Sequence, residues 1–218
     1  MELWSEKLML LDNRKDGKMN YKKPWHVLDI DISNAVREDF DFQNLYSKSE
    51  YYGKPAGIWN FMHNTVDQLL SQQWIDYMHS IGLPVKSAMV FFRKPYYIHS
   101  GAHVDVFWSG EIAIGAINWV LDPMDDSEMI WYDVPLDSGQ SLLTPAQTKY
   151  LHWNLDSVKN HVLDRRCIAA QPTLVNVGIP HNIIVKSRSR WAVSVRLESD
   201  VVHSWQEMVD YFSPFIKN

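Results

Sequence analysis

The sequence contains one cysteine, Cys167, among its 218 residues. A single cysteine excludes an intrachain disulfide framework and the Cys₂ or Cys₄ ligand sets of zinc sites. No apolar run approaches the roughly 18–20 residues that a membrane-spanning helix needs. The first residues (MELWSEK) also lack the basic and apolar regions of a secretory signal. We therefore expect a soluble, cytoplasmic protein with no membrane partner.

An excess of basic residues is also missing. The chain has 21 Lys and Arg against 26 Asp and Glu, which gives a formal net charge of −5. Nucleic-acid-binding proteins normally carry a basic surface stripe, so we expect no nucleic-acid partner. What the chain does have is large aromatic residues, with ten Trp and ten Tyr, and 46% apolar residues overall. These values predict a single domain with a substantial core or a lined pocket.

Helical patterns lie mainly at the two ends of the chain. Residues 61–81 carry apolar side chains at a spacing of about 3.6 and predict a helix, and Ser204 with Glu207 forms a possible capping box for a C-terminal helix. Thr144-Pro145 predicts the start of a helical insert over about 144–164. Residues 1–86 are expected to form an N-terminal arm, with residues 12–23 exposed, and supporting helices. Residues 198–218 are expected to form the C-terminal helix.

Short segments rich in β-branched and aromatic residues fill the region between. Turn residues separate them, and they cover residues 87–92, 111–121, 128–134, 174–185 and 190–197. Several such strands in succession favour an antiparallel sandwich or barrel over residues 87–197. The expected fold class is mostly β with flanking helices (α+β).

One constellation of residues indicates chemistry. In the segment His103-Val104-Asp105 the two outer residues share one face of a strand, because strand side chains alternate. His181 follows the turn at 178–180 and opens another strand. Two histidines and one carboxylate can hold a metal and leave positions open on it. A lone H-x-D segment is more often a solvated turn, so the hypothesis needs support from residues elsewhere.

The strand expected at 190–197 adds two arginines. Arg190 lies nine residues after His181 and shares one face of the strand with Ser194 and Arg196, whereas the opposite face is apolar. A buried arginine must be paired. Its partner could be a dicarboxylate cosubstrate, which a guanidinium binds through two parallel hydrogen bonds, or an acidic residue of the protein itself. The spacing alone leaves both alternatives open.

Together, these residues resemble the Fe(II)/2-oxoglutarate-dependent dioxygenase superfamily, with the spacing of its prolyl-hydroxylase-like members. The segments 116–121 and 129–132 are also similar to small bacterial and phage members of that group. The resemblance covers residues 87–197 and implies a double-stranded β-helix (jelly-roll, cupin-like) core. It implies iron held by His103, Asp105 and His181, which would be the catalytic centre. It also implies 2-oxoglutarate bound by Arg190, with Ser194 as a second contact, and O₂ as the oxidant.

The sequence departs from the family at one position. Many prolyl-hydroxylase-like members have a tyrosine ten residues before the first iron ligand, where this chain has Arg93. The remaining cosubstrate contacts are therefore open, with Tyr96, Tyr97 and Asn118 as candidates. Candidate substrate contacts are Arg93, Arg196 and Trp131. Other histidines are assigned lesser roles: His99 in a loop near the site, and His152 and His161 on the surface or in a lid.

The expected activity is hydroxylation of a small molecule or of an amino-acid or peptidyl side chain, with formation of succinate and CO₂. Asp105 favours hydroxylation or desaturation over halogenation, because related halogenating enzymes lack that carboxylate. Two alternatives remain: a cupin-like metal enzyme that does not use 2-oxoglutarate, and a non-enzymatic β-sandwich binding module. The arginines tilt the expected substrate toward an anionic, amino-acid-like molecule, and the C-terminal helix could support a homodimer.

Overall fold

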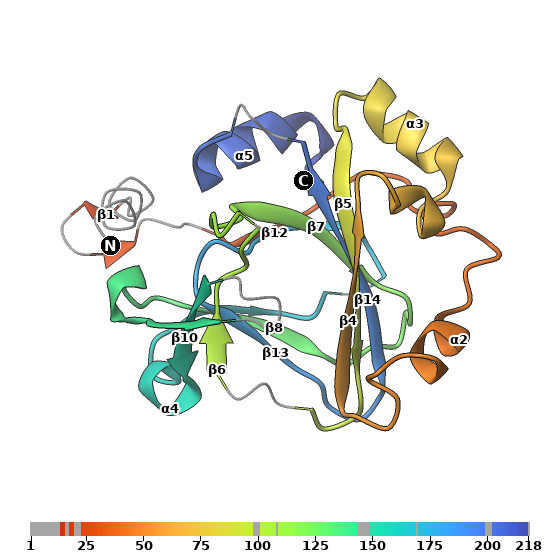
Figure 1. Cartoon of the computed structure of the whole chain (residues 1–218). Coiled ribbons are helices and arrows are strands. Elements are labelled where there is room, and N and C mark those ends of the chain that lie inside the picture. Colours follow the sequence, from red (N-terminus) through yellow and green to blue (C-terminus); the bar gives the residue numbers. More distant parts are fainter. Residues whose placement is uncertain are drawn as a thin grey trace.

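The computed structural model describes residues 23–97, 101–107, 109–143, 149–168, 170–198 and 202–217. It also describes two short strands near the N-terminus, β1 (Arg14–Lys15) and β2 (Lys18–Met19), which pair with each other. The rest of the described chain forms two six-stranded antiparallel sheets with a few short helices (Figure 1). The expectation of a mostly β protein with flanking helices is therefore confirmed.

The strands of each sheet come from distant parts of the sequence. The first sheet, which we call the β14 sheet, has the order β3 (Trp25–Val27), β12 (Thr173–Asn176), β7 (Gly115–Val120), β14 (Arg190–Leu197), β5 (Val85–Arg93) and β4 (Ala56–Met62). The second, the β13 sheet, has the order β11 (Val162–Arg166), β8 (Glu128–Tyr132), β13 (His181–Ile184), β6 (Gly101–His103), β10 (Lys149–Asn154) and β9 (Gln140–Leu143).

Eight of these strands form nested antiparallel pairs. The innermost pair is β8 with β11, and around it lie β7 with β12, β6 with β13, and β5 with β14. Successive pairs alternate between the two sheets, so the antiparallel ribbon winds back and forth across the core. This winding brings the start of β14 next to the end of β5 and the start of β13 next to the end of β6.

Helices cover the outer face of the β14 sheet. Figure 1 shows α3 (Gln72–Ser80) and α5 (Trp205–Phe212) on the side of this sheet, and α2 (Phe42–Ser47) beside β4. Val193 and Val195 of β14 pack there against Trp74 of α3 and Phe212 of α5, in one buried cluster. The apolar face predicted for residues 190–197 therefore lies under helices, and the face with the arginines turns toward the other sheet.

The remaining short elements surround the sheets. They are η1 (Val66–Gln68), η2 (Leu136–Ser138), α4 (Leu155–Val158) and η3 (Ser213–Phe215). Every helix in the described part of the chain is too short or too polar to cross a lipid bilayer.

Two helix predictions were wrong in their extent. Within residues 61–81, β4 continues to Met62 and only η1 and α3 are helical, because the Ser71 side chain accepts a hydrogen bond from the Trp74 amide and starts a new helix. The periodic apolar residues of this segment are nevertheless buried together in the core.

The helical insert expected at about 144–164 is mostly β structure where it is described. Residues 149–154 form β10, which pairs with both β9 and β6, and helix α4 has only four residues. The physical reason is that burial alternates from one residue to the next, as in a strand. Leu151 and Trp153 are buried in one apolar cluster, while Tyr150 and His152 alternate with them. The predicted helix start, Thr144-Pro145, lies outside the described residues.

Candidate metal centre

The three predicted metal ligands come together at one edge of the space between the sheets. His103 is the last residue of β6 and lies directly opposite His181, the first residue of β13. Asp105 follows two residues after His103, and two backbone hydrogen bonds fix it: its amide donates to the Val177 carbonyl and its carbonyl accepts from Ala113, both at 2.9 Å. The alternation predicted for His103 and Asp105 therefore places both side chains beside His181.

The ligand atoms of the three side chains converge. All lie within 4.8 Å of one another. Asp105 Oδ1 is 3.5 Å from His103 Nε2 and 3.7 Å from His181 Nε2. The two imidazole ring centres are 4.7 Å apart. Three donors at such separations can share one ion at their centre with little movement.

The orientation of His181 suits a metal ligand. Its Nδ1 lies 2.9 Å from the Ile179 carbonyl, so a neutral ring carries its proton on Nδ1 and presents the lone pair of Nε2 to Asp105 and His103. The pKa of His181 is lowered to about 4, mainly by burial and next by the nearby His103, while Asp105 acts in the opposite direction. The ring is therefore neutral at physiological pH, which is the form that binds metals.

Arg196 holds the carboxylate of Asp105 from behind. Its Nη2 donates to Asp105 Oδ2, and its Nη1 donates to Ser194 Oγ at 2.7 Å. With Oδ2 engaged, Oδ1 is the oxygen that faces the two histidines. Burial by itself opposes ionisation of Asp105, but the hydrogen bond from His103 and the charge of Arg196 hold its pKa well below the ordinary range. The predicted substrate contact Arg196 is thus placed against a metal ligand.

Arg190 lies deeper between the sheets, next to a second carboxylate. Its Nε is 3.6 Å from Asp125 Oδ2, which makes an ion pair but exceeds hydrogen-bond distance. Asp125 is fixed by the amide of Ser127 at 3.0 Å and by its hydroxyl at 2.5 Å. Burial lowers the pKa of Arg190 to about 10, so the guanidinium remains charged at neutral pH. The internal acid that the sequence left as an alternative partner for Arg190 is therefore Asp125.

The remaining predicted contacts lie near Arg190, opposite Ser194 or opposite His181. Arg93 lies directly opposite Arg190 in the β5–β14 pair, and the Tyr97 ring centre is 5.2 Å from its Cζ. Asn118 lies opposite Ser194 and, among the described residues, its buried Oδ1 has no hydrogen-bond partner. Trp131 lies opposite His181 and donates from Nε1 to the Asn176 carbonyl at 2.7 Å.

Some candidates lie elsewhere or outside the description. Tyr96 is an exposed surface residue, with 78% of its area accessible, and His161 is also exposed. His99 lies outside the described residues.

The sequence predicts a surface or lid position for His152, but in the structure β10 places this residue opposite His103. Its neighbour Gly101 leaves the necessary room, because a Cβ atom on Gly101 would lie 2.5 Å from His152 Nε2. Burial lowers the pKa of His152, so its ring tends to the neutral form. The period-two pattern of residues 149–154 is the signal that could have found this position.

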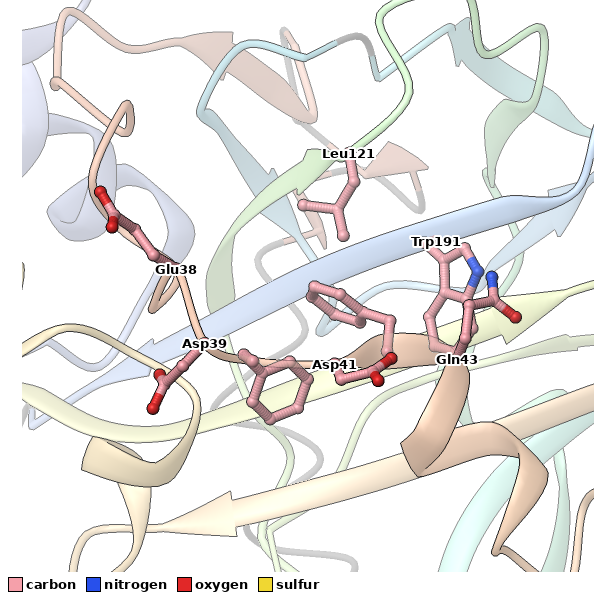
Figure 2. Close-up of a pocket in the computed structure, with 8 residues that line it drawn as sticks. Glu38, Asp39, Asp41, Gln43, Leu121 and Trp191 are labelled. Carbon is pink, nitrogen blue, oxygen red and sulfur yellow. The ribbon is translucent and has the colours of Figure 1, made fainter.

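A separate depression lies on the outer face of the β14 sheet. It has a volume of about 510 Å³, and Figure 2 shows Trp191 and Leu121 on one side of it and Glu38, Asp39 and Asp41 along its rim. Trp191 alternates with Arg190 along β14, so this hollow and the metal ligands lie on opposite faces of the sheet. Asp39 already binds Arg37 and Asp41 caps α2. The depression therefore has few free polar groups for catalysis.

No protein-family model matches the sequence, and no curated protein matches it either.

Proposed function

We propose that this protein is an Fe(II)- and 2-oxoglutarate-dependent oxygenase that hydroxylates a small, amino-acid-like or peptidyl substrate. One observation carries the proposal: His103, Asp105 and His181 converge within 4.8 Å, from strands far apart in the sequence. Two neutral imidazoles and one carboxylate are the donor set of non-haem Fe(II) oxygenases, and they leave positions for a bidentate 2-oxo acid and O₂.

The strand arrangement supports the jelly-roll part of the proposal. Four nested antiparallel pairs that alternate between two sheets are what a rolled-up β ribbon produces. In such a fold the metal ligands lie on β6 and β13, near one end of the roll, and β14 runs beside them.

Each residue of the site has a role in this mechanism. His103, Asp105 and His181 would hold the iron, which when bound supplies the activation of O₂ coupled to oxidation of 2-oxoglutarate to succinate and CO₂. Arg190 would bind the distal carboxylate of 2-oxoglutarate through its planar guanidinium. The buried ring of Trp131 beside His181 would keep water from the reacting centre.

The test is spectroscopic. Protein loaded anaerobically with Fe(II) and 2-oxoglutarate should develop a weak visible charge-transfer band, and His103→Ala should abolish it. His161→Ala, at an exposed histidine outside the triad, is the matched control and should keep the band. Absence of the band in the wild-type protein would overturn the proposal. Persistent sub-stoichiometric metal after reconstitution would instead favour a non-enzymatic binding module.

One contact favours a second candidate, a cupin-like metal enzyme that does not use 2-oxoglutarate. Arg190 already has an internal partner in Asp125, whose side chain is fully buried. If that ion pair saturates Arg190, no cosubstrate carboxylate is needed there. The two candidates separate on Arg190→Ala, which should sharply raise the 2-oxoglutarate concentration required by the oxygenase. The second candidate would show no dependence on 2-oxoglutarate at all.

A further inference from the structure

Two guanidinium groups lie side by side in the interior. Arg93, at the end of β5, is directly opposite Arg190 at the start of β14. Both residues are buried, with 7% and 4% of their area exposed. Like charges directly opposite each other in a sheet are destabilising, and burial increases the cost because water does not screen them. A pair of this kind therefore needs a compensating negative charge.

The protein supplies only part of that charge. Arg196 is paired with Asp105 and Arg190 with Asp125, whereas Arg93 has no carboxylate at ion-pair distance among the described residues; the carboxylate that acts on it from farther away is Asp105. Two carboxylates, Asp105 and Asp125, for the three buried arginines Arg93, Arg190 and Arg196 leave one positive charge in excess. Burial is the main cause of the lowered pKa of Arg190, and repulsion by the charge of Arg93 adds to it.

Hydrogen bonding shows the same deficit. Arg93 Nη1 donates to the carbonyls of Phe92 at 3.0 Å and Gly57 at 3.3 Å, which fixes the plane of the group. The Nε atoms of Arg93 and Arg190 are buried, and neither has a hydrogen-bond partner among the described residues. Buried donors without partners are rare, and a carboxylate is the acceptor that a guanidinium fork binds best.

We propose that Arg93 and Arg190 together bind the distal carboxylate of 2-oxoglutarate, so that Arg93 is a specificity-determining residue for dianionic 2-oxo acids. This inference rests on the proposed function. The incoming carboxylate neutralises the excess charge and accepts hydrogen bonds from the two fixed guanidinium groups. A 2-oxo acid of the same length without the distal carboxylate leaves the excess positive charge uncompensated.

The experiment measures binding rather than turnover. Mn(II)-loaded protein is titrated calorimetrically with 2-oxoglutarate and with 2-oxopentanoate, which has the same chain length but one carboxylate. Wild-type protein should bind 2-oxoglutarate far more tightly. Arg93→Met should weaken 2-oxoglutarate binding about tenfold or more and leave 2-oxopentanoate binding unchanged. Lys94→Met, which removes the adjacent charge whose amine donates to Gly53, is the control and should alter neither affinity.

Thermal unfolding gives a second readout. Because Arg93→Met removes a repulsive charge, the ligand-free variant should melt at the same temperature as wild type or higher, although it binds 2-oxoglutarate more weakly. A purely structural role would lower both the melting temperature and both affinities, and that result would overturn the inference. If Arg93→Met does not fold, Arg93→Lys carries the test, because it keeps the charge but loses the planar fork and should selectively weaken 2-oxoglutarate binding.

Failure of the inference is distinct from failure of the proposed function. If Arg93→Met and Arg93→Lys bind 2-oxoglutarate as tightly as wild type while Arg190→Met does not, the carboxylate uses Arg190 alone and the inference is wrong. If Mn(II)-loaded wild-type protein does not bind 2-oxoglutarate, the proposed function is wrong, and the inference with it.

Discussion

At the scale of single residues, Arg196 sets the orientation of Asp105, one of the three candidate metal ligands. Arg196 binds Oδ2 and leaves Oδ1 facing His103 and His181. Partners of this kind set the orientation of a ligand, and their loss typically weakens metal affinity about 10–100-fold. Arg196→Lys keeps the charge but loses the fork that joins Asp105 to Ser194.

We therefore predict that Arg196→Lys weakens Mn(II) binding by about tenfold, as measured by calorimetry. Arg188→Lys is the control, since Arg188 lies on the surface and binds Asp122 at 3.0 Å. An unchanged Mn(II) affinity in Arg196→Lys would mean that the two backbone hydrogen bonds of Asp105 suffice to orient its carboxylate.

The sequence predicted the convergence of His103, Asp105 and His181 better than the contacts that surround them. Strand alternation placed His103 and Asp105 on one face, and the structure brings them together with His181. The bond between Arg196 and Asp105 joins residues 91 positions apart. Periodicity describes only neighbours along the chain, so it could not identify Asp105 as the partner of Arg196, or Asp125 as the internal acid left open as a partner for Arg190.

At the scale of elements, local signals worked where a side chain satisfies a helix end. The predicted N-cap of α5 is present, because Ser204 Oγ accepts from the Glu207 amide at 3.2 Å; the Glu207 side chain accepts from the His203 amide at 2.7 Å, one residue before the N-cap, so the reciprocal bond of a capping box is displaced by one residue. We predict that Ser204→Ala lowers the free energy of unfolding by about 1 kcal/mol, as measured by urea denaturation.

The control for that variant is Ser80→Ala, at the last residue of α3, where the hydroxyl bonds only the Tyr77 carbonyl. Its effect should be near zero. If both variants lose equal stability, the N-cap of α5 contributes nothing particular and the helix is held by Trp205 and Phe212 in the core alone.

The element predictions were wrong where helical signals and a strand-like period of two occur in the same segment. Residues 149–154 are flanked by a Thr-Pro start signal and a short true helix, α4, and so resemble one longer helix. The pairing of β10 with β9 and β6 decides the outcome, because the sheets gain backbone hydrogen bonds along the whole segment. Tertiary pairing of this kind overrides local propensity and is invisible in the sequence.

At the scale of the whole molecule, winding of the β ribbon assembles the site. The ligands come from β6, from the segment after it, and from β13, while the buried arginines come from β5 and β14. An ion shared by His103, Asp105 and His181 would connect β6 and β13, which share only one register pair, His103 with His181. Metal binding should therefore stabilise the entire fold and not only the site.

We predict that Mn(II) or Co(II) at about 100 times its dissociation constant raises the free energy of unfolding by about 2.7 kcal/mol. For a chain of this length, 218 residues, that corresponds to an increase in Tm of about 5–10 °C. Differential scanning calorimetry should show the increase, and EDTA should reverse it. His103→Ala should lose it, while His161→Ala should keep it. An equal shift in His103→Ala would show that the metal binds elsewhere, since two of the three converging ligands hold an ion much more weakly than all three.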